Sequence, residues 1–443
     1  MIAKKYLGSA FFFMLQSAAL AQSHQWTLNE CIDYAINHNI DIQKRAVEIK
    51  QREIAFNTSK NAWMPTVNAD VTGVLGLGNP SGAGSSDVSM PSSSGMALQG
   101  KVSATMPLFD GFKIPNQKHA SRYSLDAATA NLEAAKKDLS INVSTYYLNC
   151  LYYKGLADVA RSQVETSRQL VERSKMMVED GKRPYSEQAD AEAQLAIDEH
   201  SLVDAEGQYT LSLLSLTQLL NLPELESFQI VDDEAALGIS PQSASLTPPQ
   251  NLYDDAVNNW PSIIASQSSV REKEYMLKVQ RAGYYPTLSL QGSVGTSAFQ
   301  IFDTPVPSFG KQLDNALGEI IGLSLSIPIF NKFSTRNYIR QAKNDILLSQ
   351  LSLDDSRLKL RKEIQTAYYN ATVAVRKRES SAKSCEANRI SVDYEQIRFD
   401  EGRSDIFTLL QARQKFVKAQ QDAVQAKYES LIRLKILDFY TQR

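Results

Sequence analysis

The sequence is poor in the residues that build enzyme sites and disulfide frameworks. Its 443 residues include three cysteines and four histidines. Cys31, Cys150 and Cys385 are too few and too far apart for a disulfide framework, so we expect buried free thiols. The histidines show no metal-ligand spacing, and no carboxylate pair stands in a context that suggests acid–base catalysis. The sequence therefore predicts no metal, no cofactor and no enzymatic activity.

Long apolar runs are also missing, except at the start. Residues 1–21 carry Lys4 and Lys5, an apolar stretch and the small-residue site Ala19-Leu20-Ala21, which is typical of a secretory signal peptide cleaved after Ala21. No later run reaches the ~18 apolar residues of a transmembrane helix, so the mature chain can enter a membrane only as strands. The formal charge is −2. It becomes about −4 without the two lysines, which argues against nucleic acid as a partner.

The residues that punctuate the chain occur twice at one spacing. Pro107 returns as Pro328 and Gly181 as Gly402, and both subtractions, 328 − 107 and 402 − 181, give 221. Prolines and glycines mark breaks in structure, and unrelated helices would not keep them in register. We infer two equivalent structural repeats, residues 22–220 and 251–443, joined by a linker at 221–250.

Proline-free stretches predict unusually long helices. One runs from Pro115 to about Asp180 and its copy from about Thr335 to Glu401, with apolar residues three and four apart. Each would be roughly 100 Å long, which is too long for a compact domain. Shorter helices of roughly 50 Å flank them, so that two end to end match one long helix. We place these at about Thr27–Ala62, Tyr185–Leu220, Leu252–Gly283 and Ile406–Tyr440.

The helices are expected to pack as antiparallel coiled coils. Leu195, Leu202, Tyr209 and Leu216 stand seven apart. This spacing favours a coiled-coil seam, although ordinary amphipathic packing tolerates it too. Helices of matched length packed in this way make a bundle of constant height.

Two segments of each repeat alternate apolar and polar residues. They are residues 65–77 and 98–108 in the first repeat and 286–296 and 319–329 in the second. Such alternation over about ten residues is typical of a membrane β-barrel strand, and equally of a half-buried strand in a soluble sheet. Long polar loops at one end of the strands and helices at the other favour the barrel.

Aromatic residues gather where helices meet strands. Two interpretations stay open: a girdle at the membrane interface, or a hydrophobic plug that packs the helix-to-strand transition. The residues are Trp63, Phe109 and Phe112 in the first repeat, and Tyr284, Tyr285, Phe330 and Phe333 in the second.

The strands of one chain are too few for a closed barrel. An open edge in lipid would leave backbone groups without hydrogen bonds, so the chain must assemble with others. Two chains would supply eight strands, and side chains fill the interior of a barrel of that size. Three chains would supply twelve strands, which leave room for a pore. A trimer is the smallest assembly that makes a channel.

Particular segments carry a family resemblance. They are the signal peptide, the start from Trp26 to Asn39, the Pro-Leu-Phe-Asp-Gly and Pro-Ile-Phe turns that begin at Pro107 and Pro328, and the segment from Gly402 to Ala412. Together with the duplicated order of helix, strand pair and long helix, they resemble the TolC-like outer membrane efflux proteins. The resemblance covers essentially the whole mature chain.

The resemblance implies a mainly α-helical fold with a β-barrel contribution. Long antiparallel coiled-coil helices would form a tunnel in the periplasm, and four strands per chain would form a twelve-stranded barrel in outer membrane lipid, in a homotrimer. The implied function is the exit duct of a tripartite efflux system that exports small molecules such as drugs. The implied partners are a periplasmic adaptor (membrane fusion) protein and an inner membrane pump. Residues 221–250 would join the C-terminus in a belt around the middle of the tunnel.

The two helix-to-helix turns are the candidate periplasmic tip. Gly181, Lys182 and Arg183 form one turn, and Gly402, Arg403 and Asp405 the other. We expect these turns to meet the adaptor and pump. Arg403 and Asp405 are candidates for bonds across the closed tip, and we expect the channel to open when the second-repeat hairpin swings outward.

The acidic ring of the family is missing from its usual place. In family members it often lies six and nine positions after the glycine of the second turn, where this chain has Thr408 and Gln411. The same distances from Gly181 lead to Glu187 and Asp190. These two carboxylates are candidates for a substitute ring that would concentrate negative potential, or for a solvated helix face, which we favour.

Two other functions stay open on the sequence. The channel could serve a type I protein secretion system, because the pump chooses the cargo. From a different class, a soluble periplasmic coiled-coil adaptor or scaffold would bind proteins without forming a pore.

Overall fold

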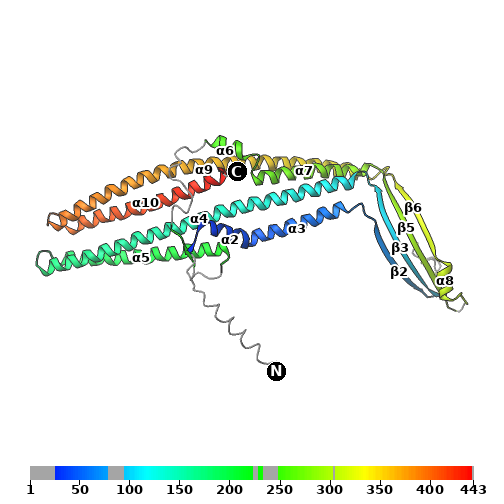
Figure 1. The fold of residues 1–443 in the computed structure, drawn as a ribbon, viewed down its shortest axis with the longest axis horizontal. Helices are drawn as coiled ribbons and strands as arrows, with labels where there is room; N and C mark the ends of the chain where they lie inside the picture. The colour runs from blue at the N-terminus through cyan, green and yellow to red at the C-terminus, as the bar shows by residue number, and fades with distance from the viewer. Residues whose placement is uncertain (1–24, 78–93, 223–227, 233–247, 303–304, 442–443) are drawn as a thin grey trace, which may run out of the picture. The chain divides into compact units, whose positions relative to one another are not determined.

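The computed structural model describes residues 25–77, 94–222, 228–232, 248–302 and 305–441 (Figure 1). The expected signal peptide and most of the expected linker lie outside these residues. The chain divides into two compact units, and each draws on both sequence repeats. Unit 1 comprises Met1–Ala46, Asn131–Pro261 and Arg357–Arg443, and unit 2 comprises Val47–Ala130 and Ser262–Ser356.

The long helices follow the spacing of the sequence repeat. Helices α4 (Lys113–Glu179) and α9 (Ser334–Asp400) have 67 residues each, or about 100 Å. Helices α5 (Tyr185–Leu220) and α10 (Ile406–Thr441) have 36 residues each. Every start and end in one pair differs from its counterpart by 221 positions. The repeat is therefore one of structure as well as of sequence.

The first of the shorter helices is broken where the sequence predicts one continuous helix. Residues 27–62 contain α2 (Leu28–His38) and α3 (Ile40–Lys60). Asn39 between them is extended, with ψ 129°. Its Oδ1 accepts hydrogen bonds from the amides of Asp41 and Ile42 at 2.9 and 3.3 Å. This side chain caps α3, which is why the helix restarts there.

The equivalent helix of the second repeat is broken at the equivalent place. It consists of α6 (Pro249–Ala256), α7 (Pro261–Arg281) and the short 3₁₀ turn η2 (Ala282–Tyr284). Pro261 has no amide hydrogen and disfavours helical geometry in the residue before it, so a new helix starts at this proline. That preceding residue, Trp260, stands 221 positions after Asn39. Both single-helix predictions were wrong at corresponding points.

Unit 1 is built from helical hairpins around a small apolar core. Helix α5 runs back along α4, and α10 along α9 (Figure 1). Along the expected seam Leu216 is buried, while Leu195, Leu202 and Tyr209 are half-buried. The core lies where α2, α4 and α5 meet, and its largest buried side chain is Tyr147.

A short two-stranded ribbon closes this core. β1 (Gln25–Trp26) pairs in parallel with β4 (Gln229–Ile230). The Tyr147 hydroxyl lies 3.0 Å from the carbonyl oxygen of Trp26 and 2.8 Å from that of Val231. Residues 229–231 of the expected linker are therefore held against the start of the described chain.

The cysteines are free thiols. Cys31 and Cys150 are buried in the unit 1 core, as expected. Cys385 is only half-buried, so the prediction of a buried thiol was wrong there. Burial raises the pKa of Cys31 to about 12 and that of Cys150 to about 11. Both core thiols are therefore protonated and unreactive at neutral pH.

Unit 2 contains one antiparallel four-stranded sheet. Its strands are β2 (Thr66–Gly76), β3 (Gly95–Phe109), β5 (Thr287–Ile301) and β6 (Gly318–Ser326), in the order β2-β3-β5-β6. β3 and β5 are longer than the alternation alone predicts. A short helix, α8 (Phe309–Asn315), lies between β5 and β6 and was not expected. Gln312 fixes α8 to β5 through hydrogen bonds with both backbone groups of Phe299 at 2.8 and 2.9 Å.

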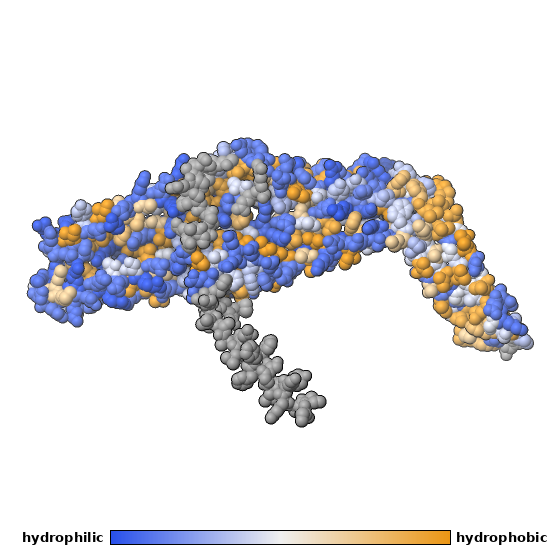
Figure 2. Space-filling view, in the orientation of Figure 1, coloured by the Kyte–Doolittle hydropathy of each residue, from blue (hydrophilic) through white to orange (hydrophobic). Residues whose placement is uncertain are grey.

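The register gives the sheet one apolar and one polar face. Directly opposed residues form rows across the strands, and successive rows alternate between the faces. Many apolar side chains are exposed in the single chain, among them Ile321 at 85% and Leu323 at 68%, and Figure 2 shows hydrophobic residues gathered over the strands. Two apolar rows are Val67–Ala104–Gly292–Ile321 and Met106–Leu290–Leu323; two polar rows are Thr66–Thr105–Gln291–Gly322 and Pro107–Ser289–Ser324.

None of the helices in the described ranges combines the length and apolar character needed to span a bilayer.

Candidate functional site

Both helix-to-helix turns of unit 1 depend on a left-handed glycine. Gly181 has φ 70° and Gly402 has φ 73°. In the first turn the amide of Lys182 donates to the carbonyl of Met177, and that of Gly181 to Val178, both at 2.9 Å. The second turn repeats both bonds 221 positions later. This pairing closes the end of a helix and requires positive φ, so glycine is needed here for its backbone freedom.

The two turns differ in how the next helix begins. Asp405 caps α10, because its Oδ1 accepts the amide of Thr408 at 2.7 Å. The same hydrogen bond is the main cause that lowers the pKa of Asp405. Helix α5 has Pro184 at this position and no side-chain cap. The second turn therefore starts its helix with a charged group and the first does not.

Arg183 joins the two turns. Its Nη2 donates to the carbonyl oxygens of Phe399 and Ser404 at 3.2 and 3.1 Å. Its guanidinium carbon lies 4.8 Å from the centre of the Phe399 ring, a cation–π distance. Its Nη1 pairs with Glu187 at 3.2 Å. One side chain thus fastens the tip of α4/α5 to the tip of α9/α10.

Glu187 lies inside this contact. Its side chain is only 13% exposed. Oε1 meets Arg183, and Oε2 is buried without a hydrogen-bond partner among the described residues. The interpretation of Glu187 as a solvated carboxylate was wrong, because Arg183 and the packed turns cover it. Asp190 is exposed.

The remaining expected tip residues stay at the surface or pair locally. Lys182 pairs with Asp180 at 2.9 Å, and Arg403 pairs with Glu401 at 3.0 Å. Thr408 is half-buried and Gln411 is exposed. Arg403 and Asp405 therefore make local contacts in the single chain, and Arg183 makes the bonds between its two hairpins at the tip.

Further polar contacts join the two hairpins beside the second turn and beyond it. Arg173 of α4 pairs with Asp400 of α9 at 2.8 Å. Arg413 of α10 donates to the carbonyl of Thr166 on α4 at 3.5 Å, and within its own hairpin to Gln396 Oε1 of α9 at 2.7 Å. Burial lowers the pKa of Arg413. The sequence analysis did not single out Arg173 and Arg413, because Asp400 lies 227 residues from Arg173 and Thr166 lies 247 residues from Arg413.

Within α4 and α5, Asp198 is a buried polar centre. It accepts hydrogen bonds from Ser167 at 2.5 Å, from Gln163 at 3.1 Å and from Gln194 at 2.9 Å. A buried carboxylate with three donors is well satisfied. It helps to fix how α4 and α5 pack.

The aromatic residues of unit 2 lie at the helix-to-strand junctions, and most are exposed. Phe109 meets Phe112 edge-on at 5.2 Å, and the copy pair Phe330 and Phe333 meets at 5.4 Å. Phe112 and Phe333 both have positive φ, 67° and 61°. Phe330 is 71% exposed. These pairs shape the turns, and their exposed rings leave both the girdle and the plug interpretations open. Trp63, Tyr284 and Tyr285 are exposed at the same junctions.

Long helical hairpins and an amphipathic sheet in a duplicated chain define a channel-forming outer membrane protein. The chain belongs to the outer membrane efflux protein family, whose sequence model matches residues 31–222 and 252–441. The family consists of outer membrane channels rather than enzymes. The protein is accordingly an outer membrane efflux protein with the fold of the solved outer membrane channels.

Individual relatives are distant in sequence. Toxin and drug export protein A of Aggregatibacter actinomycetemcomitans is 20% identical over 404 residues, which cover 90% of this chain and 83% of the relative. Alkaline protease secretion protein AprF of Pseudomonas aeruginosa is 23% identical over 353 residues, 76% of this chain and 68% of the relative. The crystal structure of the Campylobacter jejuni CmeC outer membrane channel superimposes with a TM-score of 0.76 at 16% identity, covering 93% of this chain and 85% of that one.

Proposed function

We propose that three copies of this chain form the exit duct of a tripartite efflux system in the outer membrane. The single observation that carries the proposal is the sheet of unit 2. It has an apolar face, a polar face and two edges without a strand partner among the described residues. All three properties suit a sector of a channel wall. The exposed apolar face and the unpaired edges would be costly in an isolated chain.

The edges set the proposed number of copies. The outer edges of β2 and β6 have no strand partner among the described residues. In lipid, unpaired backbone groups cost several kcal/mol each, so β2 of one copy should pair with β6 of the next. Three copies of four strands give the twelve-stranded barrel, with apolar rows toward lipid and polar rows toward the lumen.

The helices supply the proposed tunnel, and the two turns its periplasmic tip. Gly181, Lys182 and Arg183 would meet the adaptor and pump together with Gly402 and Arg403. We infer that the same tip is the gate. Arg183 supports this inference, because its bonds to the second hairpin are few and lie at the extreme end of the helices. An outward swing of α9/α10 would have to break them.

Cysteine crosslinking tests the ring. Ala69→Cys on β2 and Leu323→Cys on β6, both on the apolar face, should be joined between chains by a short thiol-bridging reagent, and denaturing gels should show a trimer. Ala69→Cys with Val294→Cys is the matched control, because Val294 lies on the inner strand β5. Linked dimers without trimers, or equal linking in the control, would contradict the ring.

Extraction and contact with a partner test the location and the tip. The protein should need detergent for extraction, whereas a soluble scaffold would appear in the periplasmic fraction without it. Cysteines at Lys182 and Arg403 should crosslink to a periplasmic adaptor in cells. Reaction of these cysteines only with probes added outside the cell would invert the proposed topology.

The cargo is proposed to be small molecules such as drugs. The relatives' names point in two directions, since one includes drug export and another protease secretion. The choice is tested by deleting the gene and restoring it on a plasmid. Higher intracellular accumulation of dyes and drugs in the deletion strain supports efflux. An unchanged accumulation together with the loss of one secreted protein would assign the duct to type I secretion.

A further inference from the structure

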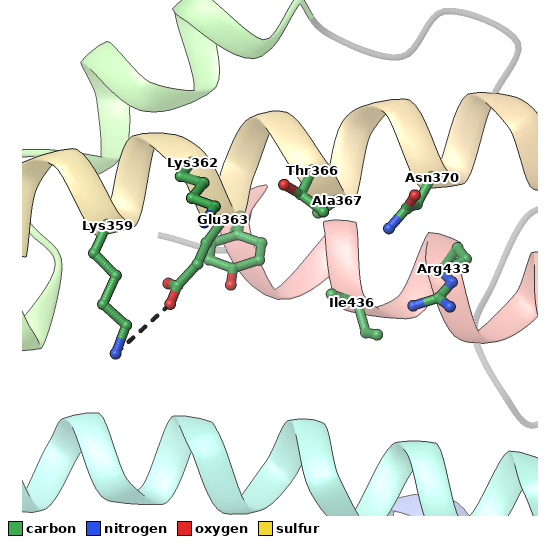
Figure 3. Close-up of a pocket in the computed structure, with 9 residues that line it drawn as sticks. Lys359, Lys362, Glu363, Thr366, Ala367, Asn370, Arg433 and Ile436 are labelled. Atoms are coloured by element: carbon green, nitrogen blue, oxygen red, sulfur yellow. Dashed lines mark ion pairs between the residues drawn. The ribbon is translucent and has the colours of Figure 1, made fainter.

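Unit 1 contains a cavity that the proposed duct does not use. It has a volume of about 410 Å³ and lies between α9 and α10, far along both helices from the turns. This size falls within the range of small-molecule sites. Figure 3 shows side chains from both helices around it. The lining residues that matter here are Lys359, Lys362, Glu363, Asn370, Arg433 and Tyr440.

The cavity carries more positive than negative charge. Lys359 lies 3.9 Å from Glu363, so these two largely offset each other. Lys362 and Arg433 form no ion pair within the described residues, and Arg433 is half-buried. Lys362 is exposed, so Arg433 is the less solvated of the two cations. An anion in the cavity would have both as positively charged partners.

The polar groups stand at opposite ends of the cavity. Figure 3 places Arg433 beside Asn370 at one end and the Lys359–Glu363 pair at the other, with Ile436 between them. Arginine binds carboxylates and phosphates through two parallel hydrogen bonds, and an amide adds a third donor. The arrangement suits a ligand with charged groups at both ends and an apolar middle.

An aromatic wall completes the cavity. Tyr440 stacks on Trp260 with ring centres 5.1 Å apart and an angle of 22°. Lys137 of α4 places its amino group 4.3 Å from the centre of the Trp260 ring. Burial raises the pKa of Tyr440 to about 12, so the phenol stays neutral. The Glu363 and Asp138 carboxylates also raise the pKa of Tyr440, so a flat apolar body would pack on the neutral ring with these two carboxylates nearby.

We propose that this cavity is a binding site for a small organic dianion with a flat apolar body, such as an aromatic dicarboxylate. Arg433 and Asn370 would hold one carboxylate, Lys362 the other, and Ile436 and Tyr440 the ring. The site lies outside the turns that we assign to the gate. Its ligand would therefore be a bound effector or a passenger held beside the tunnel wall, distinct from the contact at Arg183.

Calorimetric titration of the purified full-length protein in detergent tests the site, with isophthalate as the probe. Isophthalate should bind, benzoate should bind more weakly, and neutral isophthalamide should not bind. Arg433→Gln and Lys362→Gln should each weaken isophthalate binding about tenfold or more, since each removes one charged partner. Arg433→Lys should keep part of the affinity and so report that the fold is intact.

Lys383→Gln is the matched control. Lys383 is an exposed cation on the same helix, outside the cavity, and its loss changes the net charge equally. This variant should bind isophthalate as the native protein does. Quenching of Trp260 fluorescence in a Trp26→Phe, Trp63→Phe background gives a second readout, because Trp260 stacks on the cavity wall.

Particular results would overturn the proposal. Equal binding by Arg433→Gln and the native protein would show that the heat comes from elsewhere, and equal binding of isophthalamide would remove the role of charge. If the native protein binds no isophthalate while Arg433→Gln loosens the oligomer, a carboxylate of a neighbouring copy fills the cavity instead.

Discussion

Replacing Arg183 by methionine should destabilise the contact between the two hairpin tips. The change removes two hydrogen bonds to carbonyl oxygens, the cation–π contact with Phe399 and the partner of the half-buried Glu187. Hydrogen bonds to charged groups contribute roughly 1.5–3 kcal/mol each, but these are near the long end of the range. We therefore expect the free energy that holds the two hairpin tips together to fall by about 2 kcal/mol, which corresponds to roughly a 30-fold shift toward separated hairpins.

Single-channel recording in a planar bilayer measures that shift. The open-to-closed ratio of Arg183→Met should rise by about the same roughly 30-fold factor, if each opening event separates one pair of hairpins. Lys182→Met is the matched control, because it removes the same charge from the same turn, while the Lys182 ion pair is with Asp180 of its own hairpin. An open-to-closed ratio equal to that of the native protein would show that the two hairpins move together and that the gate lies between chains.

Three further outcomes are expected. Gly111→Ala should lower the melting temperature, because φ is 68° there and a Cβ would lie 2.8 Å from a backbone oxygen. Gly322→Ala, with open space around the added methyl group, should change the melting temperature little. Equal shifts of the two variants by calorimetry would contradict this. Asp405→Ala should lower the free energy of unfolding at neutral pH and much less in acid. Folding lowers the pKa of this carboxyl, so its stabilising effect is present above the unfolded pKa and is lost as pH falls through the folded pKa. A difference in denaturant unfolding that does not depend on pH would refute the prediction. Cys385 should react with a maleimide far faster than Cys31 in the native protein, and mass spectrometry showing equal rates would contradict the burial of Cys31.

The long helices could be read from the sequence because their signals are local. Proline-free runs, a glycine after each helix and apolar spacing fixed α4 and α9 to within two residues of their observed bounds. The sheet followed from alternation, although the lengths of β3 and β5 did not, since the added residues are held by pairing with each other. Asn39 could have signalled a helix break, because asparagine is a common cap; its position inside an otherwise helical pattern concealed it.

The candidate site was predictable in place but not in its contacts. Glycines marked both turns, and Arg183 stood in the expected tip. Nothing near Arg183 in sequence indicates that it bonds to Ser404, its own counterpart in the second repeat. That contact depends on how two hairpins pack. For the same reason the sequence pointed to Arg403 and Asp405, which in the structure pair with Glu401 and cap α10; their joint replacement by alanine should shift gating less than Arg183→Met.

The free edges of β2 and β6 have a genetic consequence. In a duct built as proposed from three copies, each sheet supplies the partner for both of its neighbours, so one defective edge interrupts the whole ring. A cell that makes equal amounts of normal and edge-defective chains would assemble roughly one ring in eight from normal chains alone, if the copies mix at random. A proline placed in the middle of β6 should therefore be dominant over the normal allele, whereas a defect confined to one tip residue should be closer to recessive.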